Sequence, residues 1–410
     1  MTNNIVIIGA GQAATQAANS LRQNGFEGKI TMLGDEGVSP YQRPPLSKAY
    51  LMGEVELARL KFRDDEQWEK EGIELRPNDP AIKIERAAKI VITKSGEKIG
   101  YDKLIIATGS RVREIKCEGS ELKGIHYLRT LAQSDALKAD LEQAKSIAII
   151  GAGYIGLEVA AIARKKGLMV NVIELAPRVL ARVATPIISQ YFENLHAAHG
   201  VNIMTNCALK AFGGEDKVQS LLLEDDRQID ADVVLVGIGI IPNCEIAIEA
   251  GIMCSNGIDV NDNAQANDEN IYACGDCTNR ELNLYGIRMR LESVHNALEQ
   301  AKLAAAHIMG AEAPKLDTPW FWSDQYDVKL QIAGLSNGAA QHVVRGNMQE
   351  NKFAVFHLDA ENRILAIDAI NSPGEFLVGK KLVAASSKIA PQIISDMGIS
   401  IKDLAAHAVE

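Results

Sequence analysis

The order of apolar and polar stretches predicts two strand–helix–strand motifs at well-separated places in the chain. Four consecutive apolar residues, Ile147–Ile150, are typical of a strand buried on both faces of a parallel sheet. A glycine-rich turn follows, then a helix of small residues from Leu157 to Arg164, then a second apolar strand, Met169–Ile173. The same order of stretches occurs in residues 4–35. The chain therefore contains one motif twice.

The turn of the later motif has the pattern G-x-G-x-x-G, formed by Gly151, Gly153 and Gly156. The first glycine allows a tight turn, the second lets the backbone approach a pyrophosphate, and the third lets the helix pack closely on the strand. The helix N-terminus offers free N–H groups to that pyrophosphate. Glu174 follows about twenty residues later, where a carboxylate accepts hydrogen bonds from a ribose. We predict a dinucleotide site, with an ordinary glycine-rich turn as the alternative.

The earlier motif carries Gly9 and Gly11, alanine at the third glycine position (Ala14), and Asp35 as its terminal acid. Alanine still permits close packing of helix and strand. Two motifs predict two dinucleotide sites, for which a flavin dinucleotide and a nicotinamide dinucleotide are the most plausible pair, one taking a hydride from the other. The fingerprints alone leave open which site holds which.

The segments between and after the motifs predict the domain organisation. An apolar strand ends near Gly109 and another leads to Ile240, which favours insertion of the second motif's domain into the first. We predict a first domain of residues 1–109 and 240–316, an inserted domain of 110–239, and a C-terminal α+β domain of 317–410. The last would contain strands in WFWSDQYDVKLQIAG, HVVRG, FAVFHL and ILAIDAINS and a helical tail from Glu375. Dimerisation or a lid is a simple alternative role for it.

Composition and charge exclude several classes of protein. The chain has 410 residues, 47% of them hydrophobic and 23% charged, as in ordinary globular proteins. A net charge of −10 without a basic block argues against nucleic-acid binding. The apolar stretch 147–163 contains three glycines and Glu158, so we expect no membrane span. The N-terminus lacks a signal-peptide pattern and six scattered cysteines give no disulfide framework, so we expect a cytoplasmic protein.

Several short stretches together carry a resemblance that extends over nearly the whole chain: PPLSKAYL (44–51), YLRTL (127–131), GAGYIGLEVA (151–160), RVLARV (178–183), GIGIIPNCE (237–245), CGDC (274–277), LESVHNALEQA (291–301) and PWFWSDQYDVKLQ (319–331). In these the chain resembles the bacterial FAD-dependent NADH:ferredoxin reductases of oxygenase systems, the putidaredoxin reductase-like family. The resemblance implies an α/β fold with two Rossmann-like domains of the glutathione reductase-like type, the second inserted in the first, followed by the C-terminal α+β domain.

Carried over residue by residue, the resemblance places non-covalent FAD at the first motif. It implies that Gly9, Gly11 and Ala13 contact the pyrophosphate and that Asp35 lies near the adenosine ribose. It further implies Lys48 near the flavin ring, Ala81 and Arg129 at the adenine and pyrophosphate end, Asp276 at the ribityl–phosphate chain, and Val294 at the ring edge. Without the resemblance, Lys48 and Arg129 read as an ordinary surface lysine and a helix-cap arginine.

For NADH the resemblance implies the second motif, with Gly151, Gly153, Gly156, Glu158 and Glu174, and with Tyr154 and Ile155 lining the turn. We predict that Glu158 pairs with Lys48 and orients the nicotinamide. The alternative is a carboxylate in the first helical turn, where the helix dipole alone favours it.

Glu174 predicts a preference for NADH, because a carboxylate accepts both ribose hydroxyls and repels the extra phosphate of NADPH. Arg178 and Arg182 follow closely and could soften that preference.

Hydride transfer from nicotinamide to flavin needs proximity and stacking more than acid–base groups. The resemblance implies that the reduced flavin passes electrons singly to a [2Fe–2S] ferredoxin, which serves a cytochrome P450 or another oxygenase. Trp320 and Trp322 are candidates for the edge that meets this partner, and aromatic core is their alternative. We expect a monomer or a homodimer.

Other functions remain open at this stage. Cys274 and Cys277 have redox C-x-x-C spacing, which raises a disulfide reductase, although the pair flanks the Gly-Asp expected to hold FAD. Rubredoxin reductase, NADH oxidase and an NADH-sensing flavoprotein are further alternatives. The histidines have no metal-ligand spacing with cysteine partners, so we predict no metal site; they include His126, His196, His199 and His295.

Overall fold

The computed structural model describes residues 2–409, and its contacts divide the chain into two compact units. The first unit contains the chain up to residue 43 together with 56–111 and 240–316. The second contains residues 44–55, 112–239 and 317–410. Each glycine-rich motif therefore lies in a different unit. The division is coarser than the three predicted domains, whose boundaries stay a prediction.

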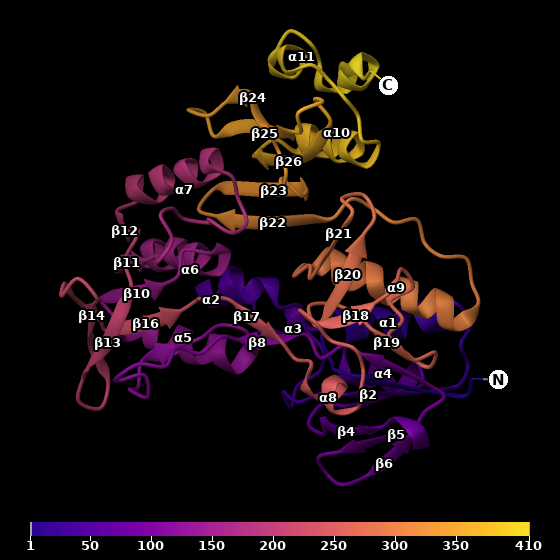
Figure 1. Cartoon of the computed structure of the whole chain (residues 1–410). Coiled ribbons are helices and arrows are strands. Elements are labelled where there is room, and N and C mark those ends of the chain that lie inside the picture. Colours follow the sequence, from indigo (N-terminus) through magenta and orange to yellow (C-terminus); the bar gives the residue numbers. More distant parts are fainter. Residues whose placement is uncertain (1, 410) are drawn as a thin grey trace. The chain divides into compact units, whose positions relative to one another are not determined.

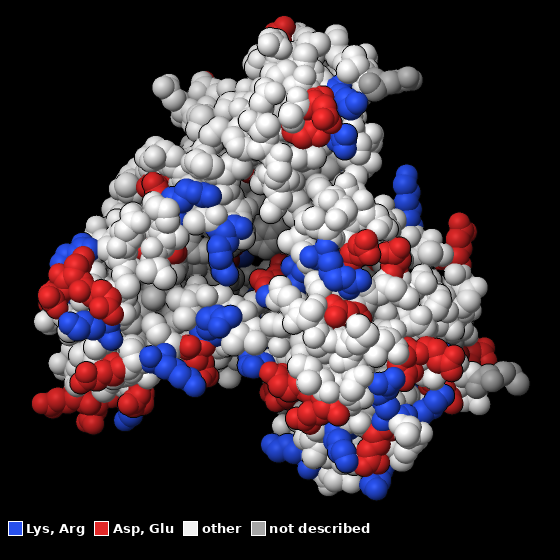
Figure 2. Space-filling view, in the orientation of Figure 1, with Lys and Arg blue, Asp and Glu red and all other residues white. Residues whose placement is uncertain are grey.

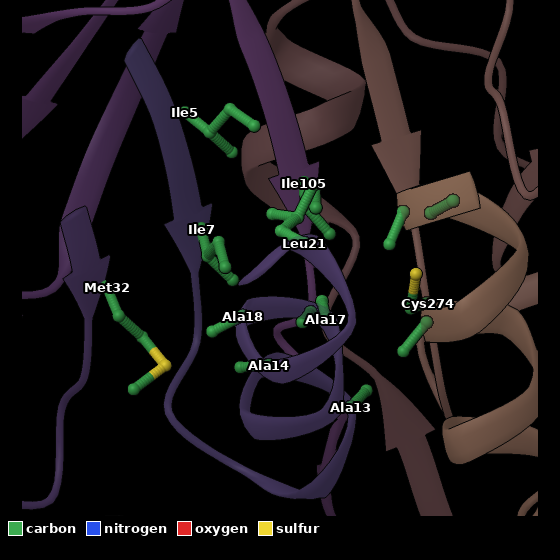
Figure 3. Close-up of a cluster of buried hydrophobic side chains, with 14 of the residues drawn as sticks. Ile5, Ile7, Ala13, Ala14, Ala17, Ala18, Leu21, Met32, Ile105 and Cys274 are labelled. Atoms are coloured by element: carbon green, nitrogen blue, oxygen red, sulfur yellow. The ribbon is translucent and has the colours of Figure 1, made fainter. Parts of the chain in front are cut away.

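The first motif forms the centre of a parallel five-stranded sheet in the first unit (Figure 1). Helix α1 (Gln12–Gln23) connects β1 to β2 and packs on α9 (Val294–Met309). Ala14, Ala17 and Ala18 of α1 are fully buried, and their small side chains let the helix lie close to its neighbours (Figure 3). The strand order is β19 (Ile271–Ala273), β7 (Lys103–Ile106), β1 (Asn4–Ile8), β2 (Lys29–Leu33) and β3 (Ile73–Arg76).

Small sheets and short helices complete the first unit. One antiparallel sheet consists of β4 (Ala81–Glu85), β5 (Ile90–Thr93) and β6 (Lys98–Gly100), and a mixed sheet of β18 (Ile258–Val260), β20 (Thr278–Leu282) and β21 (Ile287–Met289). Strand β8 (Ser110–Val112) pairs with β17 (Ile240–Pro242). The helices are α3 (Leu57–Leu60), α4 (Asp65–Lys70), η2 (Arg86–Ala88) and α8 (Glu245–Glu249).

The second motif repeats this arrangement in the second unit. Helix α6 (Tyr154–Lys165) connects β10 to β11, and the parallel sheet has the order β12 (Val201–Met204), β11 (Met169–Ile173), β10 (Ser146–Ile150), β16 (Val233–Val236) and β9 (Ile125–His126). A meander follows in β13 (Leu209–Gly214), β14 (Val218–Leu223) and β15 (Gln228–Asp230). The helices are η1 (Pro44–Ser47), α2 (Ala49–Met52), α5 (Leu131–Gln143) and α7 (Pro186–Ala198).

The C-terminal part of the second unit is an antiparallel sheet covered by helices. Its order is β22 (Trp320–Gln325), β23 (Val328–Gly334), β26 (Ile364–Ile370), β25 (Lys352–Leu358) and β24 (Gln341–Asn347). One face packs on α10 (Pro373–Ala384), α11 (Pro391–Ser395) and η3 (Ile401–His407), which close a hydrophobic core. All four predicted apolar stretches form strands here. The first is a hairpin that turns at Tyr326, whose φ is +57°.

Side chains along β22 alternate between the two faces of this sheet. The Trp320 ring lies 5.9 Å from that of Phe376 on α10. The next ring, Phe321, lies 4.6 Å from Tyr154 at the start of α6. One strand therefore contacts the C-terminal core on one side and the second motif on the other.

The helix of the second motif begins earlier than predicted. We expected it to start at Leu157, but α6 starts at Tyr154, and Gly153 is its N-cap in an extended conformation. Glu158 consequently lies beyond the first turn, and the expectation that it belongs to that turn is wrong. Since the helix dipole acts mainly within the first turn, it cannot account for the position of this carboxylate.

Charged side chains of both signs are mixed over much of the visible surface (Figure 2). Around α11 and β24 the visible surface is mostly uncharged (Figures 1 and 2). Within residues 2–409, no helix combines the length and the apolar character that crossing a bilayer requires.

Candidate functional site

The first motif forms an open cradle of backbone N–H groups. Gly9 has a φ of +118°, and a Cβ there would lie 2.2 Å from the carbonyl oxygen of Ala107, so only glycine fits. Gly11 is the N-cap of α1, provides no side-chain cap, and has open space where a Cβ would point. The first N–H groups of α1 therefore face an open position that suits a pyrophosphate.

The second motif forms the same kind of cradle. Gly151 has a φ of +99°, and a Cβ there would lie 2.5 Å from the carbonyl oxygen of Gly237. Gly153 has open space beside it, as Gly11 has. A Cβ on Gly156 would lie 2.2 Å from the carbonyl oxygen of Gly151 and 3.2 Å from Cγ2 of Ile149 in β10, which agrees with its predicted part in close packing of helix and strand. The geometry fits a second pyrophosphate.

The terminal acid of the second motif is held in place by backbone. Glu174 accepts hydrogen bonds from the N–H of Ala152 at 2.6 Å and of Ala176 at 2.7 Å, one to each carboxylate oxygen. Each oxygen keeps acceptor capacity for a ribose hydroxyl. Arg178 is engaged within its own loop, donating to the carbonyl oxygens of Ala181 and Ala184. Arg182 is exposed.

Glu158 is the centre of a buried polar cluster. Its side chain is 2% exposed. One carboxylate oxygen, Oε2, accepts hydrogen bonds from Ser47 at 2.5 Å and from the Lys48 ammonium at 2.7 Å. The other, Oε1, accepts one from Ser323 of β22 at 2.7 Å. A buried carboxylate needs such partners, because desolvating an unpaired charge costs several kcal/mol.

The structure thus brings together Lys48 and Glu158, as predicted. Ser47 and Ser323 were missed. Ser47 has a signal in the sequence, since it precedes Lys48 in the same turn. Ser323 has none, because its contact with α6 depends on how the C-terminal sheet packs.

Tyr154 and Ile155 occupy the first turn of α6. The hydroxyl group of Tyr154 is buried and has no hydrogen-bond partner among the described residues. Burial first, and then the charges of Asp368 and Glu158, raise the pKa of Tyr154 well above its ordinary value. Ile155 points outward and is 41% exposed.

The loop that carries Asp276 lies beside the first motif. Gln300 of α9 fixes this loop, because its carbonyl oxygen accepts hydrogen bonds from the N–H of Gly275 at 2.9 Å and the hydroxyl of Thr278 at 2.8 Å. A Cβ on Gly275 would lie 3.2 Å from the Cβ of Ala13. Ala13 and Asp276 are therefore neighbours in the fold, although they are far apart in the sequence. Gln300 was not predicted.

The remaining predicted FAD residues occupy varied places. Asp35 is exposed beyond the end of β2. Ala81 opens β4 and Val294 opens α9, and both are partly buried. Arg129 precedes α5 in the second unit, where its backbone N–H donates to Gln133 at 2.8 Å. Among the FAD residues, only Lys48 and Arg129 belong to the second unit.

The two cysteines of the C-x-x-C pattern lie in different hydrophobic clusters. Cys274 packs with α1 and α9 (Figure 3), whereas Cys277 packs with residues such as Leu104. Both are fully buried. Burial raises the pKa of Cys277 to about 11 and raises that of Cys274 well above its ordinary value. Such thiols are poor nucleophiles, which argues against a redox dithiol.

The two tryptophans of β22 are both partly buried. The Trp320 ring packs against the C-terminal core and lies 5.5 Å from that of Trp322. The Lys380 ammonium lies 5.6 Å from the Trp320 ring. Trp320 is thus partly a core residue, which was the alternative to a role at the partner-facing edge.

Similarity to known proteins extends over nearly the whole chain. Residues 3–301 match the pyridine nucleotide-disulphide oxidoreductase family, and residues 320–405 match the reductase C-terminal family. Rhodocoxin reductase of Rhodococcus erythropolis is 41% identical over 399 residues, which are 97% of this chain and 93% of that protein. A rubredoxin–NAD(+) reductase of Pseudomonas putida is 40% identical over 370 residues, 90% of this chain and 96% of that protein.

The crystal structure of the covalent putidaredoxin reductase–putidaredoxin complex contains a chain with the same fold. The TM-score is 0.96 at 38% identity, over 99% of both chains. These matches confirm the resemblance, the predicted fold class with its two Rossmann-like domains, and the cofactors FAD and NADH. The chain belongs to the pyridine nucleotide-disulphide oxidoreductase family.

Proposed function

We propose that this protein is an NADH:ferredoxin oxidoreductase, which passes electrons from NADH through FAD to a [2Fe–2S] ferredoxin that serves a cytochrome P450 or another oxygenase. The observation that carries the proposal is the pair of open glycine cradles in one chain, the second of which begins the helix that holds the Glu158–Lys48 pair. Similarity to reductases over nearly the full length supports it.

The first cradle is proposed to hold FAD. Gly9, Gly11 and Ala13 would receive the pyrophosphate, and Asp276, held by Gln300 through Gly275, would bind the ribityl–phosphate chain. Asp35, Ala81, Arg129 and Val294 are proposed as further contacts. When bound, FAD supplies a two-electron acceptor for hydride and a one-electron donor to the partner.

The second cradle is proposed to hold NADH. The N–H groups that follow Gly151 and Gly153 would bind its pyrophosphate, with Gly156, Tyr154 and Ile155 shaping the turn. Glu174 would bind the adenosine ribose, and because Arg178 is already engaged, it does not offset the repulsion of a 2′-phosphate. Glu158 would hold the Lys48 ammonium in one place, where its charge stabilises the electron-rich form of a neighbouring flavin.

The acceptor surface is proposed to include Trp322 and the exposed part of Trp320. The boundaries 1–109, 110–239, 240–316 and 317–410 are proposed as those of the FAD, NADH, FAD and C-terminal domains. We further propose a monomer or homodimer in the cytoplasm, supported by six free cysteines, four of which are buried.

The test is reduction of cytochrome c by NADH, measured with and without candidate [2Fe–2S] ferredoxins. We expect a rate that depends on the ferredoxin and is lower with NADPH. A rate that no [2Fe–2S] protein stimulates would overturn the proposed function and leave the family assignment intact.

A second candidate, rubredoxin reductase, is favoured by the rubredoxin–NAD(+) reductase relative. The same assay with rubredoxin in place of ferredoxin distinguishes the two. Oxygen as the main acceptor would give rapid NADH consumption without any added protein, which identifies an NADH oxidase. Slow reduction by NADH together with a long-lived complex would identify an NADH sensor.

A further inference from the structure

A chain of hydrogen bonds runs from Glu158 into the C-terminal sheet and on to α7. Glu158 accepts from Ser323 at 2.7 Å, and Ser323 accepts from the side-chain amide of Gln325 at 3.1 Å. The carbonyl oxygen of Gln325 lies 2.8 Å from Nε2 of His196. The other ring nitrogen of His196 lies 3.2 Å from the hydroxyl of Tyr326. All five groups belong to the second unit.

The inner members of this chain are almost fully buried. Ser323 and His196 are 0% exposed and Gln325 is 1% exposed. Ser323 and Gln325 lie on the opposite face of the sheet from Trp320, which packs on the hydrophobic core that α10 closes, and neither residue belongs to that core. Burying so many polar groups is costly unless all are satisfied, and a fully satisfied network fixes one arrangement.

The donors and acceptors of this network can be assigned in one direction. A carboxylate only accepts, so the Ser323 hydroxyl donates to Glu158 and its oxygen accepts from Gln325. Gln325 then accepts from the N–H on Nε2 of His196, and the bare Nδ1 accepts from Tyr326. Burial lowers the pKa of His196 to about 4, which agrees with a neutral ring at pH 7. The serine hydroxyl therefore has one direction in which to point.

Ser323 is also the partner that fixes the second carboxylate oxygen. Ser47 and Lys48 both bind Oε2, whereas Ser323 binds Oε1. With Oε2 alone held, the carboxylate can rotate about its terminal bond, and the lysine ammonium would move with it. With both oxygens held, Glu158 and Lys48 have one geometry.

We propose that Ser323 is a positioning residue for the nicotinamide site, held in place by Gln325 and His196. It fixes the Glu158 carboxylate and, through it, the Lys48 ammonium. The C-terminal domain would then be a structural part of the site where hydride is transferred, in addition to any role in dimerisation or partner binding. This inference rests on the function proposed above.

The experiment compares Ser323→Ala with Ser323→Thr, which keeps the hydroxyl, and with a matched control, Thr318→Val. Thr318 is a buried hydroxyl residue of the same domain that donates to the carbonyl oxygen of Lys380, away from Glu158. Each holoenzyme is mixed rapidly with NADH, and the limiting rate of flavin reduction and the apparent Kd for NADH are measured. The long-wavelength charge-transfer absorbance formed with NAD+ gives a readout that is independent of turnover.

We expect Ser323→Ala to lower the limiting rate about tenfold with little change in Kd, since misplacement of an orienting group acts on the rate. The charge-transfer absorbance should weaken as well. Ser323→Thr should restore both, and Thr318→Val should match the wild type. Gln325 contacts Ser323 and not Glu158, so Gln325→Leu should lower the rate and the absorbance by a smaller amount.

A Ser323→Ala variant that equals Thr318→Val in rate and absorbance would overturn the inference, and so would a Ser323→Thr variant as slow as Ser323→Ala. If Ser323→Ala fails to fold, unchanged kinetics of Gln325→Leu overturn it instead. A wild-type protein that NADH does not reduce would overturn the proposed function as well. Normal wild-type reduction with an unchanged Ser323→Ala overturns the positioning role alone.

Discussion

The two glycine-rich motifs share a backbone and differ in the side chains around it. Gly9 and Gly151 both have positive φ, and at both a Cβ would collide with a carbonyl oxygen following the neighbouring strand. Gly11 and Gly153 are both N-caps with open space beside them. The anion cradle is thus the same in each.

The differences lie one turn into the helix and at the terminal acid. Where α1 has Gln16, which bonds to Ser20 on its own helix, α6 has Glu158, which is bonded to three residues in two other segments. Asp35 is exposed, whereas both oxygens of Glu174 are held by backbone N–H groups. Since a pyrophosphate is common to both proposed ligands, we propose that these side chains carry the specificity. A site for a ligand that is exchanged in every cycle gains most from groups fixed in advance.

The largest expected effect comes from placing a methyl group in each cradle. Gly9→Ala and Gly151→Ala each force a Cβ to within 2.2–2.5 Å of a carbonyl oxygen. We expect Gly9→Ala to be purified without flavin, and Gly151→Ala to keep its flavin but lose reduction by NADH. Flavin absorbance and the rate of its bleaching measure the two outcomes. The reverse pattern would exchange the cofactors assigned to the two motifs.

The next largest effect is expected from replacing Glu158 of the second motif with glutamine, the residue at the corresponding position of the first motif. Glu158→Gln removes the negative charge that holds Lys48, and we expect the limiting rate of flavin reduction to fall about a hundredfold. The matched variant, Gln16→Glu, changes the corresponding position of α1 and should alter that rate less than about threefold. Rapid mixing with NADH measures both. Equal effects of the two variants would mean that Glu158 has no specific role in flavin reduction.

A smaller effect is expected at the terminal acids. Glu174→Gln should reduce the preference for NADH over NADPH about tenfold, because it removes the charge that repels the 2′-phosphate. Asp35→Asn should weaken FAD retention only a few-fold, since the Asp35 carboxylate is exposed. Ratios of kcat/KM for the two nucleotides, and flavin loss on dialysis, measure these changes. An unchanged ratio in Glu174→Gln would remove Glu174 from the specificity determinants.

The last effect concerns stability below neutral pH and is expected to be small in Tm. Burial lowers the pKa of His196 to about 4, against 6.5 in the unfolded chain. The unfolded state therefore binds more protons between these values, and the contribution of His196 to stability is fully present above pH 6.5 and lost as the pH falls toward 4. The loss amounts to about 3 kcal/mol, or a few degrees in Tm.

His196→Gln lacks this titration, so its Tm should fall less than that of the wild type between pH 6.5 and 4.5. Parallel pH profiles of Tm for the two proteins would contradict the low pKa. The comparison is informative because the network of His196 reaches Glu158, and no equivalent network holds Gln16 among residues 2–409.

The sequence determines much of the fold through local patterns. The run Met169–Ile173 forms a strand with the predicted bounds because all of its residues except Asn171 are apolar and Gly167 lies just before it. The start of α6 was placed too late because aromatic Tyr154 and β-branched Ile155 are weak helix formers, and the N-cap geometry of Gly153 overrides them. The turn at Tyr326 was missed because its positive φ is unusual for tyrosine.

Only some of the residues of the candidate site could be predicted from the sequence. The glycines of both cradles follow from their spacing, and the Lys48–Glu158 pair was expected from the resemblance. Ser323 and Gln300 could not be predicted from the sequence, because each acts through a contact between distant segments that no local pattern describes. Sequence reasoning therefore identified the groups proposed to touch a ligand more readily than those that hold these groups in place.

The alternation along β22 has a consequence for how such a protein can diversify. Positions 320 and 322 carry the tryptophans proposed to meet the acceptor, while 321, 323 and 325 face the nucleotide motif and its network. Substitution of Trp322 would change the proposed acceptor surface without altering the side chains around Glu158, whereas Trp320 also packs on Phe376. Insertion of a single residue would exchange the two sets of side chains and damage both. This strand can therefore adapt to a new partner by substitution, but it cannot tolerate a change of length.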